Sequence, residues 1–272
     1  MVLNGVAMPM SSFLSAITPA PNGTIDVNAD WGQGRGIYGG VPAAAMVCAM
    51  KRDLERPECA LRSLTVHFCA PLMPGEARVE VESLRVGGRV AHMTASVIQG
   101  GAIATHATAS FAAERPVSLA WDETQMPTVP RAESLPSTPI ELFGGPQFSQ
   151  FFDYRFAGDP LPMTGSDSAR LRTWIRPTDC PVIDEIHAVG ILDAGAPAVL
   201  CRITTPRPMA SVDFRMQLFS PLPFAESDPK EHWLLDAHAR VVSEGYCEQI
   251  TWLYRPDGRP VGNCQQLIAI LA

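Results

Sequence analysis

The sequence predicts an α+β fold in which two similar halves each wrap a curved antiparallel sheet around one long buried helix. The first observation is that each half contains a short strand, an apolar helix and four further strands, in that order. The second is that tight turns separate consecutive strands, and such short connections are typical of antiparallel pairing. Each helix is therefore expected to lie inside the sheet of its own half.

Residues 1–113 form the first predicted repeat. Residues 24–31 are typical of a short strand, and residues 39–55 of a buried helix, because their apolar run ends in charged residues. Glycine and proline pairs then separate four strands, which we expect at 61–72, 76–86, 89–99 and 102–112. A meander of four strands follows the helix in this half.

Residues 114–165 differ from both flanking regions because prolines are frequent and no hydrophobic period is sustained. We expect a long connector here, with a short hairpin around residues 150–156.

Residues 166–272 form the second predicted repeat. A strand at 169–177 precedes an apolar helix at 181–195, and Asp257-Gly258 marks the last turn. The four remaining strands are expected at 210–223, 232–243, 246–256 and 261–271.

The two halves align with each other. Placing Gly101 over Gly258 sets "THATASF" above "GNCQQLI", and "RSLTVHFCAPL" corresponds to "SVDFRMQLFSPL". An internal duplication of about 110–120 residues explains the shared order of elements. A helix enclosed by a curved antiparallel sheet is the hotdog arrangement, so the sequence predicts a double hotdog.

Composition excludes several classes of function. The net charge is -7 and the basic residues form no stripe, which argues against nucleic-acid binding. The seven cysteines are an odd number without a C-x-x-C pair, as expected for reduced thiols in a cytoplasmic protein. No basic residue precedes Arg35 and no apolar run approaches the ~20 residues of a membrane span, so neither a secretory signal nor a membrane partner is expected.

The stretch "GRGIYG", residues 34–39, matches the glycine pattern of dinucleotide-binding loops. That fold would require repeated strand-helix crossovers, whereas a run of strands follows here. Two interpretations are left. The stretch is either a turn that leads into the helix, or a loop whose backbone N–H groups face a thioester carbonyl or a phosphate.

Three positions in the second half carry polar groups in unusual places. Asp193 lies at the far end of an apolar helix, where a carboxylate opposes the dipole, unless it caps the turn at Gly195. Ser211 opens a strand, and strict alternation would put Asp213 on the same face. Gln266 alternates with apolar residues and is expected to point inward.

The first repeat provides a comparison for the two glutamines of the last strand. The positions that match Gln265 and Gln266 are Thr108 and Ala109. At the inward position the second half therefore carries a polar Gln266 where the first half has Ala109, as expected if only one half retains a working site. No histidine pattern or Cys/His spacing suits a metal, so no metal or cofactor is predicted.

The strand segment "SLTVHFCAPLMPGEARVEVESLRVGG", followed by "THATASF", resembles the first repeat of the acyl-CoA thioesterase II (TesB-like) family. "SVDFRMQLFSPL" and "DGRPVGNCQQ" are similar to its second repeat. The resemblance covers about residues 25–113 and 166–272. It implies a double-hotdog enzyme that hydrolyses acyl-CoA by direct attack of water.

The same resemblance implies the roles of individual residues. The family holds the attacking water with an Asp, a hydroxyl residue and a Gln, which fall on Asp193, Ser211 and Gln266. The family usually has threonine where Ser211 stands, and serine keeps the hydroxyl. Gly39 and Gly40 are candidates, by symmetry with the other half, for backbone N–H donors to the oxyanion.

Two other interpretations stay open. A hotdog hydratase would act on an enoyl-CoA with an Asp/His or Asn/His pair near a helix, and no such pair is placed by the sequence. A non-catalytic acyl-CoA or lipid-binding protein would keep the fold and the pocket without the water-holding residues. Because hotdog sheets pair edge to edge, and the duplication already builds that pair within one chain, either a monomer or a homodimer of double hotdogs is expected, and the homodimer is favoured.

Overall fold

The computed structural model describes residues 13–180, 182–220, 222–224, 226, 228 and 230–271. The expectation that no secretory signal is present concerns the N-terminal end of the chain. Residues 1–12 of that segment are outside the described residues. The helices are α1 (Phe13–Ile17), α2 (Gly40–Leu54) and α3 (Glu185–Ala194), with 3-10 helices η1 (Ala29–Trp31), η2 (Ala132–Ser134), η3 (Ile140–Phe143), η4 (Gln147–Phe151) and η5 (Ala198–Arg202).

The strands of the N-terminal half are β1 (Thr24–Val27), β2 (Gly32–Gln33), β3 (Gly36–Ile37), β4 (Cys59–Phe68), β5 (Gly75–Val86), β6 (Val90–Gln99) and β7 (Ala102–Ala113). Those after residue 113 are β8 (Phe152–Phe156), β9 (Arg170–Pro177), β10 (Met209–Leu218), β11 (Trp233–Ser243), β12 (Tyr246–Tyr254) and β13 (Pro260–Ile270). Four strands follow the helix in each half, but the expectation of a four-strand meander is wrong. Of these described strands, only β5-β6-β7 and β11-β12-β13 pair in sequence order, whereas β4 pairs with β7 and β10 with β13. The connections from β4 to β5 and from β10 to β11 are longer than tight turns, so these strands are not held as neighbours.

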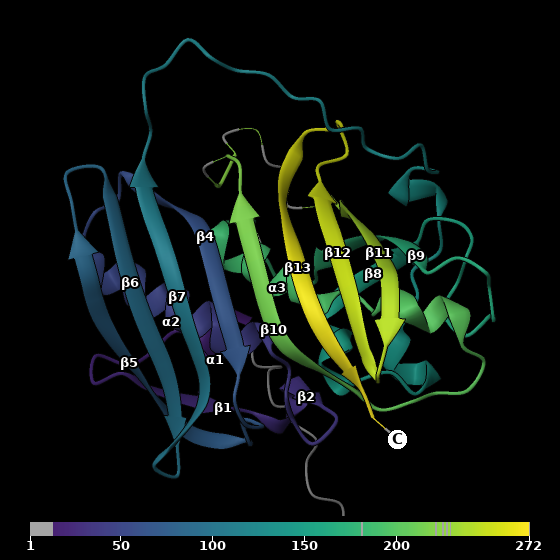
Figure 1. The fold of residues 1–272 in the computed structure, drawn as a ribbon, viewed down its shortest axis with the longest axis horizontal. Coiled ribbons are helices and arrows are strands. Elements are labelled where there is room, and N and C mark those ends of the chain that lie inside the picture. Colours follow the sequence, from purple (N-terminus) through teal and green to yellow (C-terminus); the bar gives the residue numbers. More distant parts are fainter. Residues whose placement is uncertain are drawn as a thin grey trace, which may run out of the picture.

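A single sheet crosses the molecule from one repeat to the other. Among the described residues it has 11 strands in the order β1-β5-β6-β7-β4-β10-β13-β12-β11-β9-β8. The halves meet where β4 pairs antiparallel with β10, with Val66 opposite Phe214 (Figure 1). β4 and β10 are therefore neighbours at the junction of the two repeats.

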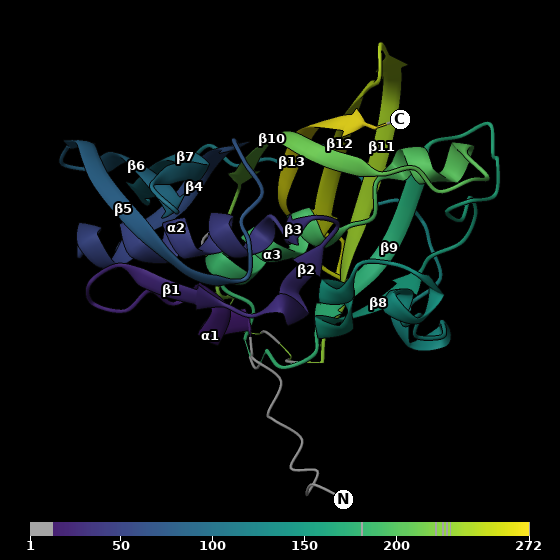
Figure 2. The same cartoon turned by 90° about the horizontal axis from the view of Figure 1, so that it is seen from below.

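Both long helices are enclosed by this sheet. α2 is buried around most of its circumference, as expected for a helix that is apolar on all sides. It contacts α3, and Figure 2 shows the two helices on the same side of the sheet. α3 begins at the N-cap Asp184, whose carboxylate accepts from the N–H groups of Ile186 and His187 and so has a structural role.

The two repeats pair their strands in the same register. Gln266 faces Phe214 across β13 and β10, and the matching Ala109 faces Leu64 across β7 and β4. The turns also agree, because Gly101 and Gly258 both have positive φ, +81° and +91°. Equivalent positions in the two halves can therefore be compared directly.

The Pro-rich connector contributes one strand to the sheet. Residues 152–156, expected in a short hairpin, form β8 instead, and β8 pairs antiparallel with β9 at the edge of the sheet. Its Tyr154 is buried in the main core. Part of the connector therefore packs with the C-terminal repeat.

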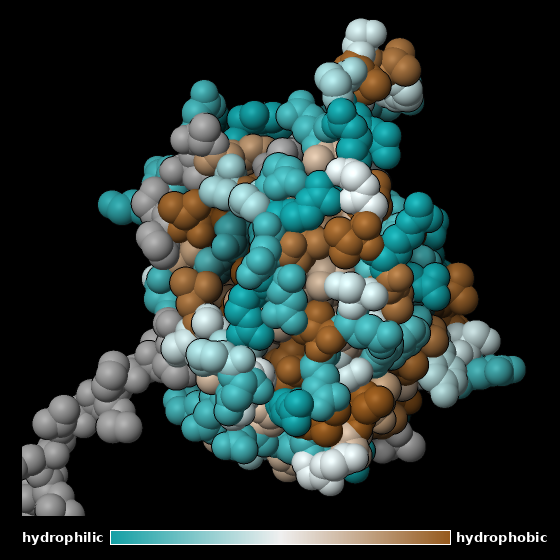
Figure 3. Space-filling model, turned by 90° about the vertical axis from the view of Figure 1, so that its left-hand side faces the viewer, coloured by the Kyte–Doolittle hydropathy of each residue, from teal (hydrophilic) through white to brown (hydrophobic). Residues whose placement is uncertain are grey.

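The surface at the opposite end of the sheet is mixed in character. Figure 3 shows hydrophilic and hydrophobic residues interspersed over this end of the molecule. Within the described part of the chain, no helix combines the length and the apolar character that crossing a bilayer requires.

Candidate active site

Asp193 lies in the last turn of α3, beside the start of α2. Its carboxylate accepts a hydrogen bond from the backbone N–H of Gly40 and another from Gln266, whose Nε2 is 2.9 Å from Oδ1. The helix-end carboxylate thus has partners on the other helix and on β13. These contacts, rather than a cap at Gly195, account for an acid at a helix C-terminus.

Gln266 also reaches the hydroxyl group expected at the strand entry. Its Nε2 is 3.4 Å from the Ser211 Oγ, and its side chain is buried whereas that of Gln265 is exposed. The inward position of Gln266 follows the alternation of β13. The structure brings Asp193, Ser211 and Gln266 together from three separate elements.

A β-bulge places Ser211 in this group. The pairing of β10 with β13 shifts between Ser211 and Asp213, so that Val212 is an extra residue. Phe214 is in the core, and strict alternation would turn Ser211 to the outer face. The expectation that Ser211 and Asp213 share a face is wrong for this reason, and Asp213 instead accepts from the Leu267 N–H on the outer side.

The environment of Asp193 favours its neutral form. Burial raises the pKa of this carboxyl from 3.8 to about 7, while the hydrogen bonds from Gly40 and Gln266 lower it. The side chain keeps part of its surface open to a pocket but is otherwise enclosed by protein. A carboxyl with a pKa near neutrality can exchange protons at physiological pH.

Two buried tyrosines complete the surroundings of Asp193. The Tyr38 hydroxyl donates to the Gly190 carbonyl, and the Tyr154 hydroxyl donates to the Ala194 carbonyl at 3.1 Å. Burial raises the pKa of both phenols well above the usual value of 10.0, so both remain donors. Tyr154 satisfies a carbonyl of the last turn of α3, which would otherwise stay unpaired beside the carboxylate, and Tyr38 binds the carbonyl of Gly190 just before that turn.

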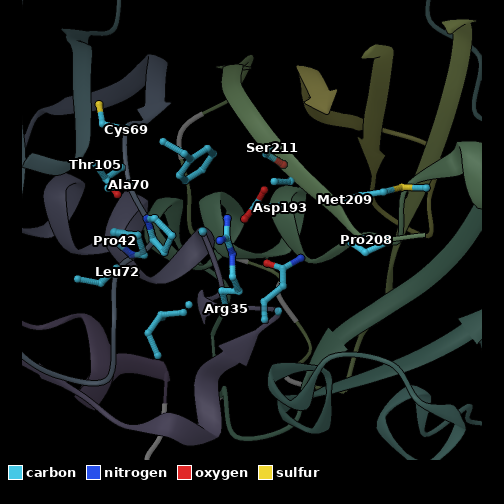
Figure 4. A pocket seen from close by; sticks show the side chains of 18 of the residues that line it. Arg35, Pro42, Cys69, Ala70, Leu72, Thr105, Asp193, Pro208, Met209 and Ser211 are labelled. Carbon is cyan, nitrogen blue, oxygen red and sulfur yellow. The ribbon is translucent and has the colours of Figure 1, made fainter. Parts of the chain in front are cut away.

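A pocket of about 570 Å³ opens in front of Asp193 and Ser211. Its walls come from the β2-β3 loop, the end of β4, the start of α2 and the start of β10, and many of its side chains are apolar (Figure 4). Arg35 points into this pocket and is the one cationic residue among its described lining residues. The space can hold an apolar chain together with a polar head.

The glycine-rich stretch forms one wall of the pocket. β2 and β3 pair as a two-stranded ribbon, and Gly34 at its tip has a φ of +60°, which favours glycine. The strand after α2 is antiparallel to its neighbours, so the dinucleotide-binding interpretation is wrong. The stretch is a pocket loop that leads into α2.

Gly39 and Gly40 have different surroundings. Gly39 lines the pocket, and a Cβ at this position would lie 2.9 Å from the Asp193 Oδ2 and 2.7 Å from the Phe68 ring. The Gly40 N–H donates to Asp193, and a Cβ there would collide with the Tyr38 hydroxyl. Gly40 therefore holds the carboxylate, while Gly39 faces the space beside it.

The first repeat lacks the polar group. Leu61 faces Phe111 as Ser211 faces Ile268, and Ala109 stands where the second repeat has Gln266. Cys48 stands where the second repeat has Asp193, because each is eight residues after the first residue of its helix. Within the described structure, therefore, the second repeat carries the Asp, Ser and Gln side chains and the equivalent place in the first repeat does not.

Sequence reasoning missed three residues at this site. The hydroxyl group of Tyr38 and the side chain of Arg35 belong to a stretch that was considered only for its glycines. Gln249 on β12 contacts Gln266, and its signal was a glutamine between buried Cys247 and Thr251 on an inward face. A hotdog hydratase would need an Asp/His or Asn/His pair at the pocket, and no histidine is among the described lining residues. His187 instead bonds Asp184 at the start of α3, away from Asp193 at its end.

Two family models match this chain. The acyl-CoA thioesterase N-terminal domain matches residues 27–112, and the acyl-CoA thioesterase C-terminal domain matches residues 123–270. The chain belongs to the acyl-CoA thioesterase family. The resemblance noted in both repeats is confirmed, and the C-terminal domain of the family includes β8.

Solved structures share the fold of this acyl-CoA thioesterase family member. A hot dog protein of unknown function from Alicyclobacillus acidocaldarius is 25% identical, with a TM-score of 0.82 over 96% of this chain and 98% of that one. A putative thioesterase II from Thermobifida fusca is 17% identical, with a TM-score of 0.79 over 97% and 99%. The acyl-CoA thioesterase II TesB2 from Mycobacterium marinum is also 17% identical, with a TM-score of 0.75 over 96% and 98%.

These likenesses confirm the double-hotdog prediction. A search of curated proteins finds no match to the chain.

Proposed function

We propose that this protein hydrolyses acyl-CoA to a free acid and CoA by direct attack of water on the thioester. The observation that carries the proposal is the hydrogen-bonded group of Asp193, Gln266 and Ser211, which opens on the pocket beside the start of α2. A carboxylate with a pKa of about 7 is suited to take a proton from water and return it later.

The chemical step assigns one role to each side chain. Asp193 accepts the proton of the water, whose oxygen forms a bond to the thioester carbon, and Ser211 and Gln266 hold the water in line. The carbon–sulfur bond then breaks, and the proton on Asp193 passes to the departing thiolate. The Gly39 N–H is the donor proposed for the oxyanion, because the Gly40 N–H is occupied by Asp193.

Release of CoA from a panel of acyl-CoA thioesters of increasing chain length tests this function. Hydrolysis by the wild-type protein, with one acid and one thiol formed per thioester, supports it. Binding of acyl-CoA without turnover would support the non-catalytic alternative. Absence of both binding and turnover across the panel would reject the substrate class.

The rate of hydrolysis is expected to rise with pH. Asp193 acts only as the carboxylate, and burial holds its pKa at about 7, so kcat/KM should follow a single ionisation near that value. A plateau is expected above pH 8, with a fall of about tenfold per pH unit well below the pKa. Initial rates with one acyl-CoA between pH 5.5 and 9 measure this; a profile without an ionisation near 7 would contradict the role of Asp193.

Arg35 is expected to bind the anionic part of CoA. The change Arg35→Gln should raise KM about two- to fivefold, as for loss of one exposed charge contact, and should leave kcat within twofold. The salt dependence of kcat/KM should weaken as well, since the charge that attracts the phosphates is gone.

Arg215→Gln is the matched control for Arg35. Arg215 is on the same strand as Ser211 but is exposed on the outer face of the sheet. Its KM should match that of the wild type. An equal rise of KM in both variants would show that the effect comes from total charge and not from the pocket.

A further inference from the structure

A second buried glutamine lies directly behind the site. Gln249 on β12 faces Gln266 on β13 in the antiparallel register, and only 2% of its surface is exposed. Its Nε2 is 3.5 Å from the Gln266 Oε1 and 3.3 Å from the Thr251 Oγ1. Its Oε1 accepts from the backbone N–H of Ala198 at 2.7 Å.

These contacts fix the direction of both amides. The Ala198 N–H can only donate, so the oxygen of the Gln249 amide must face it and the nitrogen must face Gln266. The oxygen of the Gln266 amide must then face Gln249, and its nitrogen faces Asp193. A backbone N–H in η5 therefore determines which end of Gln266 is presented to the carboxylate.

We propose that Gln249 is a positioning residue, which holds the Gln266 amide with its N–H group directed at Asp193 and Ser211. This inference rests on the proposed function, in which Gln266 orients the water. Gln249 touches neither the carboxylate nor the pocket and acts through Gln266. The hydrogen-bond path runs from Ala198 through Gln249 and Gln266 to Asp193.

A reversed Gln266 amide would disable the site. Its carbonyl oxygen would face Asp193 and could accept a hydrogen bond from the neutral acid, but it would repel the carboxylate. The rotation costs little when nothing holds the other end of the amide, because its two ends have nearly the same shape. Without Gln249, the neutral form of Asp193 would therefore be favoured, and this form cannot act as the base.

The other groups around Asp193 cannot replace this control. Burial raises the pKa of Tyr38, Tyr154 and Cys264 above their usual ranges, so all three stay neutral as Asp193 titrates. Arg35 lines the same pocket and remains cationic. Among these described groups none changes charge near pH 7, which leaves the amide direction as a determinant of how Asp193 ionises.

The first repeat supports a functional reason for Gln249. Met93 faces Ala109 across β6 and β7, as Gln249 faces Gln266 across β12 and β13. The fold therefore accepts an apolar pair at the equivalent place. A buried glutamine costs free energy unless its hydrogen bonds are made, so packing alone does not require two of them here.

The alternative is that Gln249 serves only to bind the Ala198 N–H at the start of η5. Two variants separate these roles. Gln249→Met introduces the residue of the first repeat and removes all three hydrogen bonds of the Gln249 side chain. Gln249→Glu keeps the shape and the acceptor for Ala198, but its carboxylate would turn the Gln266 nitrogen away from Asp193.

The experiment measures the titration of Asp193 and the rate of hydrolysis in parallel. ¹³C NMR of the Asp-labelled protein follows the carboxyl from pH 5 to 9 and needs no catalysis. In both variants the midpoint should move to higher pH, and kcat at pH 7 should fall about three- to tenfold, the worth of one hydrogen bond. KM should stay within twofold, and kcat should recover toward the wild-type value as the pH is raised.

Thr251→Val is the control, because it removes another partner of Gln249 and leaves the bond to Gln266. Its titration midpoint should equal that of the wild type. An unchanged Asp193 midpoint in both Gln249 variants would overturn the proposal, even if their rates fall equally at every pH. If the wild type hydrolyses no acyl-CoA, the proposed function fails, and the NMR midpoints still decide whether Gln249 orients Gln266.

Discussion

Asp193→Asn is expected to lower kcat for acyl-CoA hydrolysis about 10²- to 10⁴-fold, the usual contribution of a general base. An asparagine retains the shape of the side chain and an acceptor for Gln266 or Gly40, but it cannot take a proton from water. The pocket keeps its walls, so KM should change little. Steady-state release of CoA, with the binding of a non-hydrolysable acyl-CoA thioether as a second measurement, gives both constants.

Asp53→Asn is the matched control for this prediction. Asp53 is near the end of α2, as Asp193 is near the end of α3, but its side chain is exposed and pairs with Arg52. The control should keep the wild-type rate. Unchanged turnover in Asp193→Asn would remove this residue from the mechanism.

The same change is expected to stabilise the protein above pH 7. The pKa of Asp193 is raised from 3.8 in the unfolded chain to about 7 in the folded one, so between these values the folded state binds more protons. The contribution of Asp193 to the free energy of unfolding is therefore greatest below pH 4. It decreases as the pH rises from 4 to 7, because the folded state must then lose a proton that the unfolded state has already lost. Asp193→Asn avoids the loss and should gain about 1–3 kcal/mol at pH 8, allowing for water in the pocket.

Urea unfolding at pH 4.5 and pH 8 measures this difference. The variant and the wild type should have similar stability at the lower pH and diverge at the higher one. Asp184→Asn provides a contrast of opposite sign, because burial raises the pKa of Asp184 but the His187 and backbone hydrogen bonds outweigh it and lower the pKa. That variant should lose stability at pH 8. Equal stability of Asp193→Asn and wild type at pH 8 would show that the folded site does not destabilise the carboxylate.

Local patterns predicted much of the fold, and the family resemblance supplied the candidate roles of Asp193, Ser211 and Gln266. The turn at Asp257-Gly258, the apolar α2 and the strand alternation follow from short-range chemistry, and each is present. The alternation of β13 predicts an inward Gln266, because alternate residues of a strand share a face. Ala109 at the matching position then marked the second repeat as the polar one.

Other features depend on residues far apart in the chain. The bulge at Val212, which turns Ser211 inward, arises from how β10 pairs with β13 and leaves no period in the sequence. The N–H of Gly40 reaches Asp193 only because α2 begins beside the end of α3. The strand at 152–156 was missed as part of the sheet, since its partner β9 follows a loop of irregular composition.

Local sequence patterns were enough to indicate two similar halves with buried helices within antiparallel sheets, and a polar Gln266 where the first half has Ala109. Periodicity and turn chemistry are local properties, so a reader of the sequence can recover them. The tertiary structure decided that Asp193, Ser211 and Gln266 meet, and that the Gln266 amide is directed by Gln249. Hydrogen bonds are short and directional, and their geometry depends on strand register and helix packing across the junction of the two repeats.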